Sequence, residues 1–299
     1  MIYNRLTDLI GHTPCLFFDT VNSNRIYLKL EMFNPAGSIK DRIALSMVEA
    51  LEREGKLSAD KGVIEATSGN TGIGLAYVLA AKGIPLTLTM PASASKERVD
   101  LMKAYGAKVV LTPAELSMRG AKARAEQLAN ELGYVYLEQF SNPNNPAAHM
   151  KTTANEIRQD FPKLDYIVCG VGTGGTITGL GQILRPKYPG IKFIAVEPFE
   201  SAVLSGEAPG SHQIAGIGAG FIPPILDRSQ IDDIVKVKTS AAQALAKKLA
   251  TRGHFYGVSG AAAIIGALEV AQTVTGKTML VIIPDGGIKY MSTGVFNHE

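Results

Sequence analysis

The chain has 299 residues, of which 46% are hydrophobic and 19% charged, a composition typical of a globular protein with one or two domains. The formal net charge of +3 is small and the basic residues are scattered, which argues against nucleic acid as a partner. Two cysteines, Cys15 and Cys169, are too few for a disulfide framework and are typical of a reducing compartment. Cys169 ends an apolar run and is predicted to be a buried small hydrophobic residue.

The N-terminal segment does not resemble a signal peptide, because it carries Arg5 and Asp8 and shows no apolar central region. Charged residues such as Lys82 and Glu269 interrupt the apolar helical patterns, which argues against a membrane span. The sequence therefore predicts a cytoplasmic protein that does not enter a membrane.

Apolar strands alternate with helical patterns along most of the chain. The first predicted strand covers residues 26–30, and a helix over 39–53 follows it. A series from residue 62 predicts strands at 62–66, 85–90, 108–111 and 134–137, with helices at 71–82, 95–105 and 117–132. A second series predicts strands at 166–169, 191–196 and 278–283, with a late helix over 261–274. This alternation indicates parallel sheets with helices on both faces.

A polar, proline-rich stretch over residues 139–146, Gln-Phe-Ser-Asn-Pro-Asn-Asn-Pro, separates the two series and is the best candidate for a domain boundary. The sequence thus predicts two doubly wound, mainly parallel α/β domains with a cleft between them.

Lys40 stands at an unusual place in the sequence. Residues 34–37, Asn-Pro-Ala-Gly, break regular structure, and Ser38 is the predicted N-cap of the next helix. Lys40 then lies in the first helical turn, where the helix dipole disfavours a cation. It is either an exposed lysine paired with Asp41 or an amine nucleophile able to form a Schiff base.

Two turns share one pattern, Gly-x-Thr-x-x-Gly-Leu, at residues 69–75 and 174–180. Each follows a predicted strand and opens a helix, where backbone N–H groups converge and can bind an anion. The alternative is that the glycines only permit close helix packing.

The second turn also contains Gly170-x-Gly172-x-x-Gly175, a dinucleotide-binding fingerprint. Glu197 follows about 20 residues later, where such folds place a ribose-binding acid. An NAD-dependent dehydrogenase is therefore an alternative. Against it, the motif lies past the middle of the chain, and Thr173 and Thr176 add hydroxyl groups suited to a monophosphate.

The segment from Leu28 to Arg42 reads Leu-x-x-Glu-x-x-Asn-Pro-x-x-Ser-x-Lys-Asp-Arg. It resembles the cofactor-lysine segment of the cysteine synthase and cystathionine β-synthase family, fold-type II enzymes with a tryptophan synthase β-like architecture, and the resemblance extends over nearly the whole chain. It implies that Lys40 is the catalytic lysine and binds pyridoxal 5′-phosphate in the cleft between the domains. It also implies a smaller, mobile substrate-binding domain over 36–145, and a larger phosphate-binding domain over 1–35 and 146–299.

The resemblance assigns the remaining site residues. The substrate carboxylate is expected at the segment Thr67-Ser68-Gly69-Asn70-Thr71, with Gln139 completing the site, and Asn70 is also expected to bind the cofactor O3′. The cofactor phosphate is expected at Gly172, Thr173, Gly174, Gly175 and Thr176. For Gln139 the alternative is a loop amide that bonds nearby backbone.

Ser259 is the expected partner of the cofactor ring nitrogen. A neutral serine implies a milder electron sink, suited to β-elimination and replacement. Two departures from the family pattern stand here. The segment 257–260, Gly-Val-Ser-Gly, is one residue shorter than the family's Gly-x-Ser-Ser-Gly, and Gly286 replaces a common serine. The alternative is that Ser259 only caps the helix over 261–274.

The implied function is a transferase that makes L-cysteine from O-acetyl-L-serine and sulfide through an α-aminoacrylate, with Lys40 as the base. The segment 216–223 resembles the entrance loop of O-acetylserine enzymes. Cystathionine β-synthase or cysteine desulfhydrase activity on the same residues is the alternative, and a non-catalytic binding protein is an alternative outside the class. The family suggests a homodimer and, as a partner, the C-terminus of serine acetyltransferase. No metal motif is found.

Overall fold

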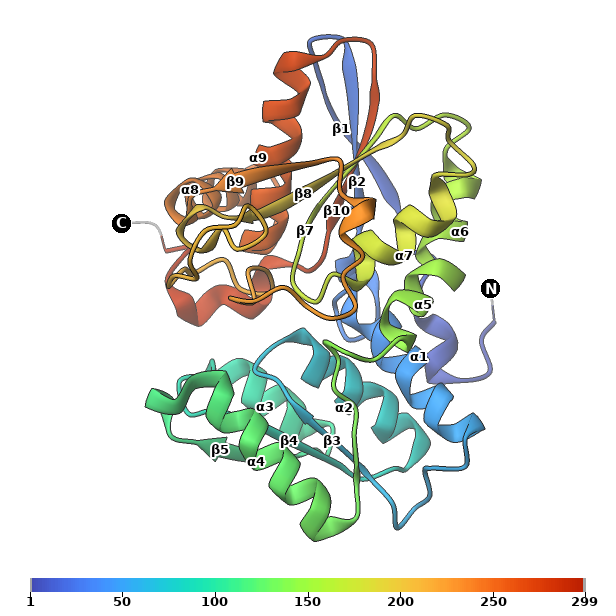
Figure 1. Cartoon of the computed structure of the whole chain (residues 1–299), viewed down its shortest axis with the longest axis vertical. Coiled ribbons are helices and arrows are strands. Elements are labelled where there is room, and N and C mark those ends of the chain that lie inside the picture. The colour runs from blue at the N-terminus through green and yellow to red at the C-terminus, as the bar shows by residue number, and fades with distance from the viewer. Residues whose placement is uncertain (1, 298–299) are drawn as a thin grey trace. The chain divides into compact units, whose positions relative to one another are not determined.

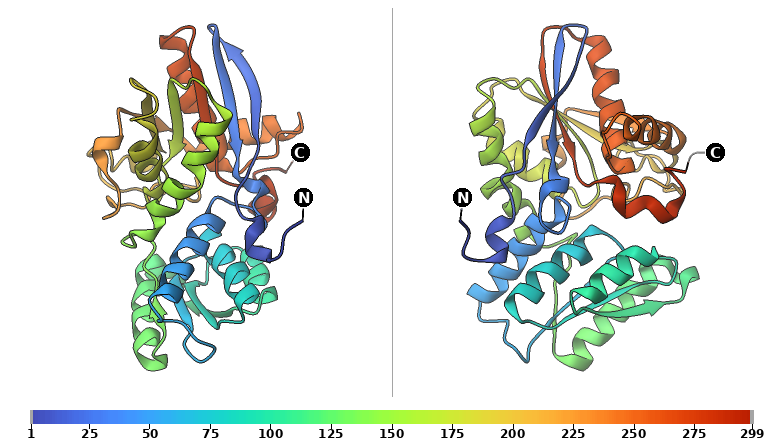
Figure 2. Two further views of the ribbon diagram at one scale, coloured as in Figure 1. Left: turned by 90° about the vertical axis from the view of Figure 1, so that its right-hand side faces the viewer. Right: turned by 180° about the vertical axis from the view of Figure 1, so that it is seen from behind.

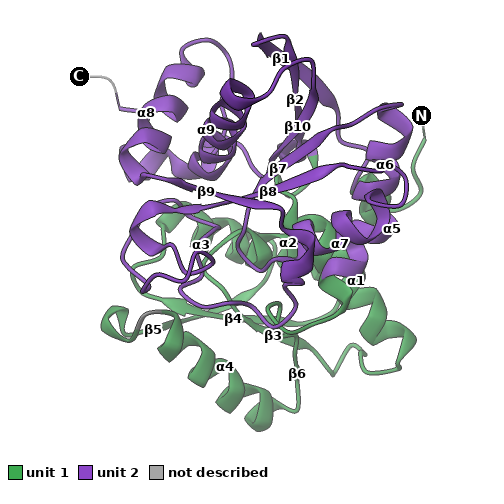
Figure 3. Ribbon diagram, turned by 45° about the horizontal axis from the view of Figure 1, so that its top comes forward, with its two compact units in different colours: residues 1–10, 34–145 green, residues 11–33, 146–299 purple. Residues whose placement is uncertain are grey.

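The computed structural model describes residues 2–297, which form two compact units (Figure 3). Unit 1 comprises Met1–Ile10 and Asn34–Asn145, and unit 2 comprises Gly11–Phe33 and Pro146–Glu299. The predicted domains differ from these units at the N-terminus, because residues 1–10 belong to unit 1. The Tyr77 hydroxyl donates a hydrogen bond to the Leu6 carbonyl (2.6 Å), which ties the short 3-10 helix η1 (Leu6–Leu9) to this unit.

Unit 1 is a four-stranded parallel sheet with strand order β5-β4-β3-β6. The strands are β3 (Val63–Ala66), β4 (Leu86–Pro91), β5 (Lys108–Thr112) and β6 (Val135–Tyr136). The helices are α1 (Lys40–Arg53), α2 (Asn70–Lys82), α3 (Lys96–Ala104) and α4 (Ser117–Leu132). Every residue of β3 and β4 is buried, as expected for parallel strands covered on both faces. Helix α4 packs on the sheet through Ala121, Ala125 and Leu128, which meet Ile64 and Ala66.

Unit 2 is a six-stranded sheet with strand order β1-β2-β10-β7-β8-β9 (Figure 1). The strands are β1 (Cys15–Val21), β2 (Asn24–Leu30), β7 (Tyr166–Gly170), β8 (Lys192–Pro198), β9 (Asp233–Val237) and β10 (Thr278–Ile283). Only the β1–β2 pair is antiparallel; the other pairs are parallel. The carboxyl ends of the parallel strands therefore lie at one edge of the sheet.

Helices cover both faces of this sheet, with α8 and α9 on one side and α6 and α7 on the other (Figures 1 and 2). The helices are α5 (Asn144–Lys151), which crosses the boundary between the units, α6 (Thr153–Asp160), α7 (Gly175–Leu184), α8 (Thr239–Ala250) and α9 (Val258–Thr273). Short 3-10 helices complete the described chain: η2 (Glu31–Phe33), η3 (Ala114–Leu116), η4 (Phe199–Ser201), η5 (Arg228–Gln230) and η6 (Gly287–Thr293).

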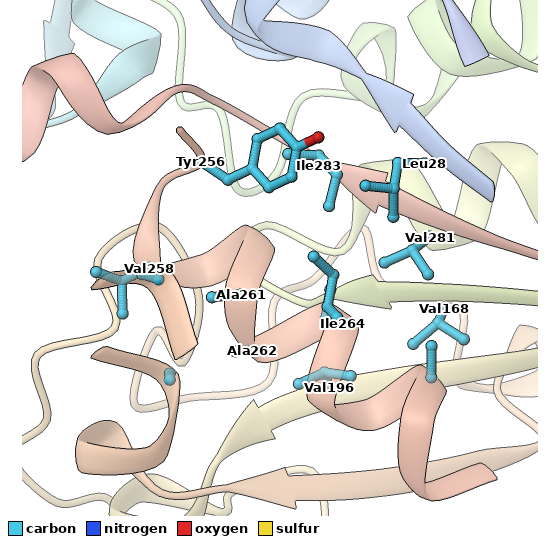
Figure 4. Close-up of a cluster of buried hydrophobic side chains, with 14 of the residues drawn as sticks. Leu28, Val168, Val196, Tyr256, Val258, Ala261, Ala262, Ile264, Val281 and Ile283 are labelled. Atoms are coloured by element: carbon cyan, nitrogen blue, oxygen red, sulfur yellow. The ribbon is translucent and has the colours of Figure 1, made fainter. Parts of the chain in front are cut away.

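The core of unit 2 lies where α9 packs on the sheet (Figure 4). Small and branched side chains of α9, including Ala261 and Ile264, meet Val168, Val196 and Val281 of the central strands. Cys169, the next residue of β7, is 2% exposed, which confirms its predicted burial. Two α/β units, each built on a mainly parallel sheet, confirm the predicted fold class. Between residues 2 and 297 no helix combines the length and apolar character needed to cross a membrane.

Candidate active site

Lys40 is the first residue of α1 and is partly buried. Ile39 occupies the N-cap position rather than Ser38, but the Ser38 hydroxyl still accepts the Lys40 backbone N–H (3.1 Å). The fully buried Asp41 carboxylate accepts the Ala36 N–H (2.6 Å). These bonds fold the turn 36–38 back onto the helix and fix the backbone that carries Lys40.

The turn after β3 leads into α2, whose N-cap is Gly69 and has no side-chain cap. The Thr67 hydroxyl accepts the Gly69 N–H (3.2 Å), which shapes the turn. One helical turn later, a Cβ atom built on Gly74 would lie 3.1 Å from the Lys40 carbonyl oxygen. Helices α1 and α2 therefore approach closely at their N-terminal ends. Unit 1 thus brings the predicted carboxylate-binding turn next to the start of the lysine helix.

Gln139 reaches the same turn from a distant part of unit 1. Its side-chain oxygen accepts a hydrogen bond from the Thr71 hydroxyl (2.6 Å), and both residues are buried. Its backbone carbonyl accepts from the Asn145 side chain (2.8 Å). The amide oxygen of Gln139 is thus engaged with Thr71, and the amide NH₂ group is the part of this side chain that can donate.

Glu65 lies behind this pair, and sequence reasoning missed it. The residue belongs to β3 and is 1% exposed, and its Oε1 atom accepts the Gln139 N–H (3.5 Å). Its Oε2 atom has no hydrogen-bond partner among residues 2–297. Burial raises the pKa of the Glu65 carboxyl to about 8, so the group is mostly neutral at pH 7. The only sequence signal was an acid inside an apolar strand.

In unit 2 the predicted phosphate loop connects β7 to α7. Gly174, the N-cap of α7, has φ of 83°, and no side chain caps the helix. A Cβ on Gly172 would lie 2.3 Å from the Gly216 carbonyl oxygen, so only glycine fits there. The loop offers backbone N–H groups together with the hydroxyls of Thr173 and Thr176. This donor set fits a phosphate dianion.

The segment 216–223, which resembles the entrance loop, lies directly on the phosphate loop. The Gly218 N–H donates to the Val171 carbonyl (3.0 Å). The His212 ring contacts the Gly218 carbonyl through Nε2 (3.0 Å) and accepts the Ile214 N–H at Nδ1 (3.2 Å). The acceptor role of Nδ1 places the ring proton on Nε2, which therefore donates to the segment.

Ser259 lies in the first turn of α9, which begins at Val258, three residues before the predicted start. Gly257 is the N-cap, so the alternative that Ser259 only caps this helix is wrong. The residue is 2% exposed. A Cβ on Gly257 would lie 2.0 Å from Asp285 Oδ1, while the Tyr290 hydroxyl donates to Asp285 Oδ2 (2.8 Å). This contact accounts for glycine before the serine.

Glu197 does not serve as a ribose-binding acid. The residue is 2% exposed, and its carboxylate accepts the Leu204 N–H (2.8 Å), the Ser205 N–H (3.0 Å) and the Ser205 hydroxyl (2.6 Å). Both oxygens are thus used to shape the segment after β8. The acid that the dehydrogenase alternative requires is structural.

A pocket of about 590 Å³ opens beside β1 in unit 2, and Cys15, Arg25, Tyr27 and Asp160 are among its lining residues. The Cys15 Sγ atom lies 3.4 Å from Asp160 Oδ2, and burial raises the pKa of the thiol to about 12. Such a thiol is inert at neutral pH. None of the predicted site residues lines this pocket. Residues 2–297 contain no cluster of three or more His, Cys, Asp or Glu side chains arranged to hold a metal ion.

Comparison with known proteins bears on the whole chain. Residues 6–285 match the family described as "Pyridoxal-phosphate dependent enzyme". Cysteine synthase from Staphylococcus aureus is 45% identical over 303 aligned residues, which cover 99% of this chain and 98% of the relative. The crystal structure of cysteine synthase from Entamoeba histolytica superposes with a TM-score of 0.95 at 40% identity, covering 100% of this chain and 92% of that one.

A third relative differs in its named activity. The O-acetylserine-dependent cystathionine β-synthase from Helicobacter pylori superposes with a TM-score of 0.94 at 36% identity, covering 99% of this chain and 100% of that one. The family match spans most of the chain, and the relatives match it almost from end to end. The chain belongs to the family of pyridoxal-phosphate-dependent enzymes.

Proposed function

We propose that the protein makes L-cysteine from O-acetyl-L-serine and sulfide by a β-replacement. One observation carries the proposal beyond family membership: Thr71 and Gln139 form a buried hydrogen-bonded pair on the unit that also carries Lys40. Neutral polar side chains that hold the turn in place, together with the backbone N–H groups at a helix N-terminus, suit an α-carboxylate. The relatives named cysteine synthase support the same activity.

Pyridoxal 5′-phosphate is the cofactor of the family, and the donor set of residues 172–176 fits its phosphate. When bound, this cofactor withdraws electrons from the α-carbon of an attached amino acid. We assign its phosphate to Gly172, Thr173, Gly174, Gly175 and Thr176, its ring nitrogen to Ser259, its O3′ to Asn70 and its aldehyde carbon to Lys40.

The substrate carboxylate is assigned to Thr67, Ser68, Asn70, Thr71 and Gln139. The Lys40 amine would be the general base that accepts the α-proton of the substrate, so that the β-acetate could leave. Sulfide then adds to the β-carbon. Ser259 carries no charge and would leave the ring nitrogen unprotonated, which would favour elimination and replacement over transamination. A smaller unit that moves on substrate binding would keep water from the reacting carbon.

Cystathionine formation is the second candidate, because the Helicobacter pylori relative is named as an O-acetylserine-dependent cystathionine β-synthase. The same site residues would serve, with a larger thiol as nucleophile. Cysteine desulfhydration on these residues is a further variant.

The visible absorption spectrum tests the proposal. The protein should show a band from the bound cofactor that moves to longer wavelength with O-acetylserine and returns on adding sulfide. Lys40→Ala should lower turnover by about 10³-fold or more, because the amine is both the attachment point and the base.

Other outcomes would redirect or refute the proposal. A spectrum that ignores O-acetylserine but responds to serine or cysteine favours the cystathionine or desulfhydrase activity. A protein that stays colourless after incubation with pyridoxal phosphate refutes the assignment of Lys40.

The resemblance leads us to propose three further properties: a cytoplasmic location, a homodimer, and binding of the C-terminal tail of serine acetyltransferase. Light scattering of the purified protein tests the dimer. Titration with a peptide of that tail, followed by competition with O-acetylserine, tests the partner, since a tail carboxylate would use the same donors.

A further inference from the structure

His149 lies in α5 of unit 2, 1% exposed, between two threonine hydroxyls. Its Nδ1 atom is 3.0 Å from Thr153 Oγ1, and its Nε2 atom is 3.3 Å from Thr176 Oγ1. A Cβ built on Gly179 of α7 would lie 2.9 Å from the His149 Cβ, so α5 and α7 touch here. This chain of polar contacts begins in α6 and ends at the phosphate loop.

The direction of these hydrogen bonds decides what Thr176 can do. A neutral imidazole has one donor and one acceptor nitrogen. If the Thr153 hydroxyl donates to Nδ1, then Nε2–H donates to Thr176 Oγ1 and leaves the Thr176 proton to another acceptor. In the opposite arrangement Thr176 donates to Nε2 and has no proton for an anion. An anion at the loop favours the first arrangement, because charge-assisted hydrogen bonds are the stronger ones.

We propose that His149 is a positioning residue that turns the Thr176 hydroxyl proton toward the cofactor phosphate, with Thr153 fixing the histidine tautomer. This inference rests on the proposed function. In the first arrangement each group donates a hydrogen bond to the next: the Thr153 hydroxyl to the imidazole, and the imidazole to the Thr176 hydroxyl. The cofactor phosphate is the acceptor at the end of this chain.

Two substitutions at this position separate positioning from packing. The amide nitrogen of a Gln side chain reaches the place of Nε2, whereas that of Asn reaches only the place of Nδ1. Release of pyridoxal phosphate from each purified holoenzyme is measured by absorbance after dilution. His149→Asn should bind the cofactor about tenfold more weakly than the wild type, and His149→Gln should stay within about twofold, since the bond concerns a charged ligand.

Pyridoxal, which lacks the phosphate, is the discriminating probe. Its affinity for the apoprotein should be the same in the wild type and in His149→Asn, and the ³¹P resonance of bound pyridoxal phosphate should shift only in His149→Asn. Equal weakening toward pyridoxal and pyridoxal phosphate would mean that His149 only packs, and would overturn the proposal. So would unchanged cofactor retention in His149→Asn.

A variant at a second position keeps the proposal testable if the His149 variants do not fold. Thr153→Val keeps the imidazole and removes the donor to Nδ1, so it should weaken retention of pyridoxal phosphate in the same direction by about threefold. If Thr153→Val retains pyridoxal phosphate as well as the wild type does, the proposed role of Thr153 is overturned. If the wild type itself binds no pyridoxal phosphate, the proposed function fails; if wild type and His149→Asn bind it equally well, only the role of His149 fails.

Discussion

The turns that open α2 and α7 share the pattern Gly-x-Thr-x-x-Gly-Leu, yet the residues that precede the pattern differ. In unit 1 the strand and turn before the shared glycine carry the side chains of Glu65 and Thr67. At the equivalent positions unit 2 has Gly170 and Gly172. At these two positions the first turn therefore presents side chains and the second presents only backbone.

The segment after β8 explains this difference. A Cβ on Gly170 would lie 2.6 Å from the Ile217 side chain, and one on Gly172 would lie 2.3 Å from the Gly216 carbonyl. In contrast, a Cβ on Gly69 would meet no atom within 4 Å. A covered turn is rigid and suits a cofactor that stays bound, whereas an open turn with side-chain donors suits a substrate that enters and leaves.

Glu65, which lies behind the turn that opens α2, should give the largest effect on stability. Burial raises the pKa of Glu65 from 4.5 to about 8, so the unfolded chain ionises this carboxyl at lower pH than the folded one. Its contribution to stability is fully present below pH 4.5 and is lost as the pH rises to 8. Glu65→Gln should therefore gain on the order of 3 kcal/mol over the wild type between pH 5 and pH 8.

Urea unfolding at several pH values measures this gain. Glu115→Gln, at an exposed position of unit 1, is the control and should follow the wild type. Parallel pH profiles for Glu65→Gln and the wild type would show that the carboxyl is not held neutral.

The covered turn should not accept a methyl group, whereas the open turn should. Gly172→Ala pushes a Cβ against the Gly216 backbone and should cost about 2 kcal/mol or more, with loss of bound cofactor. Gly69→Ala should cost at most about 1 kcal/mol, the difference between glycine and alanine as an N-cap. Thermal unfolding and absorbance measure both. Similar losses in the two variants would remove the distinction between the turns.

The Thr71 hydroxyl, in the turn that opens α2, should affect binding of the substrate and not of the cofactor. Thr71→Val removes the donor to Gln139 and should raise the KM for O-acetylserine about tenfold without changing the cofactor spectrum. Thr112→Val is the matched control, since this buried hydroxyl bonds the Met90 carbonyl instead. An altered spectrum with an unchanged KM would argue that Thr71 contacts the cofactor.

The smallest effect is expected at Gly286, where the family commonly has serine. A Cβ there would meet Met32 at 3.5 Å, an ordinary contact, and φ is −94°. Gly286→Ser should change the free energy of unfolding by no more than about 0.5 kcal/mol. A loss beyond 1 kcal/mol in urea unfolding would show that the space beside Gly286 is not available.

Much of the fold could be predicted from continuous apolar runs, because buried parallel strands carry them. Strands β1 and β9 were missed because they lie at the sheet edges and consist mostly of partly buried and exposed residues without a continuous apolar run. The start of α9 was missed because the two glycines beside Ser259 look like a turn. Gly257 is required because any side chain there would collide with Asp285, a contact that the sequence alone does not reveal.

The candidate site divides in the same way. Residues in short motifs, such as Lys40 and Thr71, could be named because neighbours in the sequence define them. Glu65 and His149 were missed because Gln139, which bonds Glu65, is 74 residues away, and Thr176, which contacts His149 at the phosphate loop, is 27 residues away. Their roles depend on burial and on packing between elements, which leave no local pattern.

The two native cysteines have a practical consequence. Cys169 is buried, and the thiol of Cys15 stays protonated at neutral pH. Maleimide dyes, which are attacked by thiolates, should therefore leave the wild type almost unlabelled. Glu115→Cys in unit 1 and Lys187→Cys in unit 2 would then provide the reactive thiols at exposed positions. Energy transfer between dyes at these two positions would follow, in single molecules, the distance between the units during each catalytic cycle.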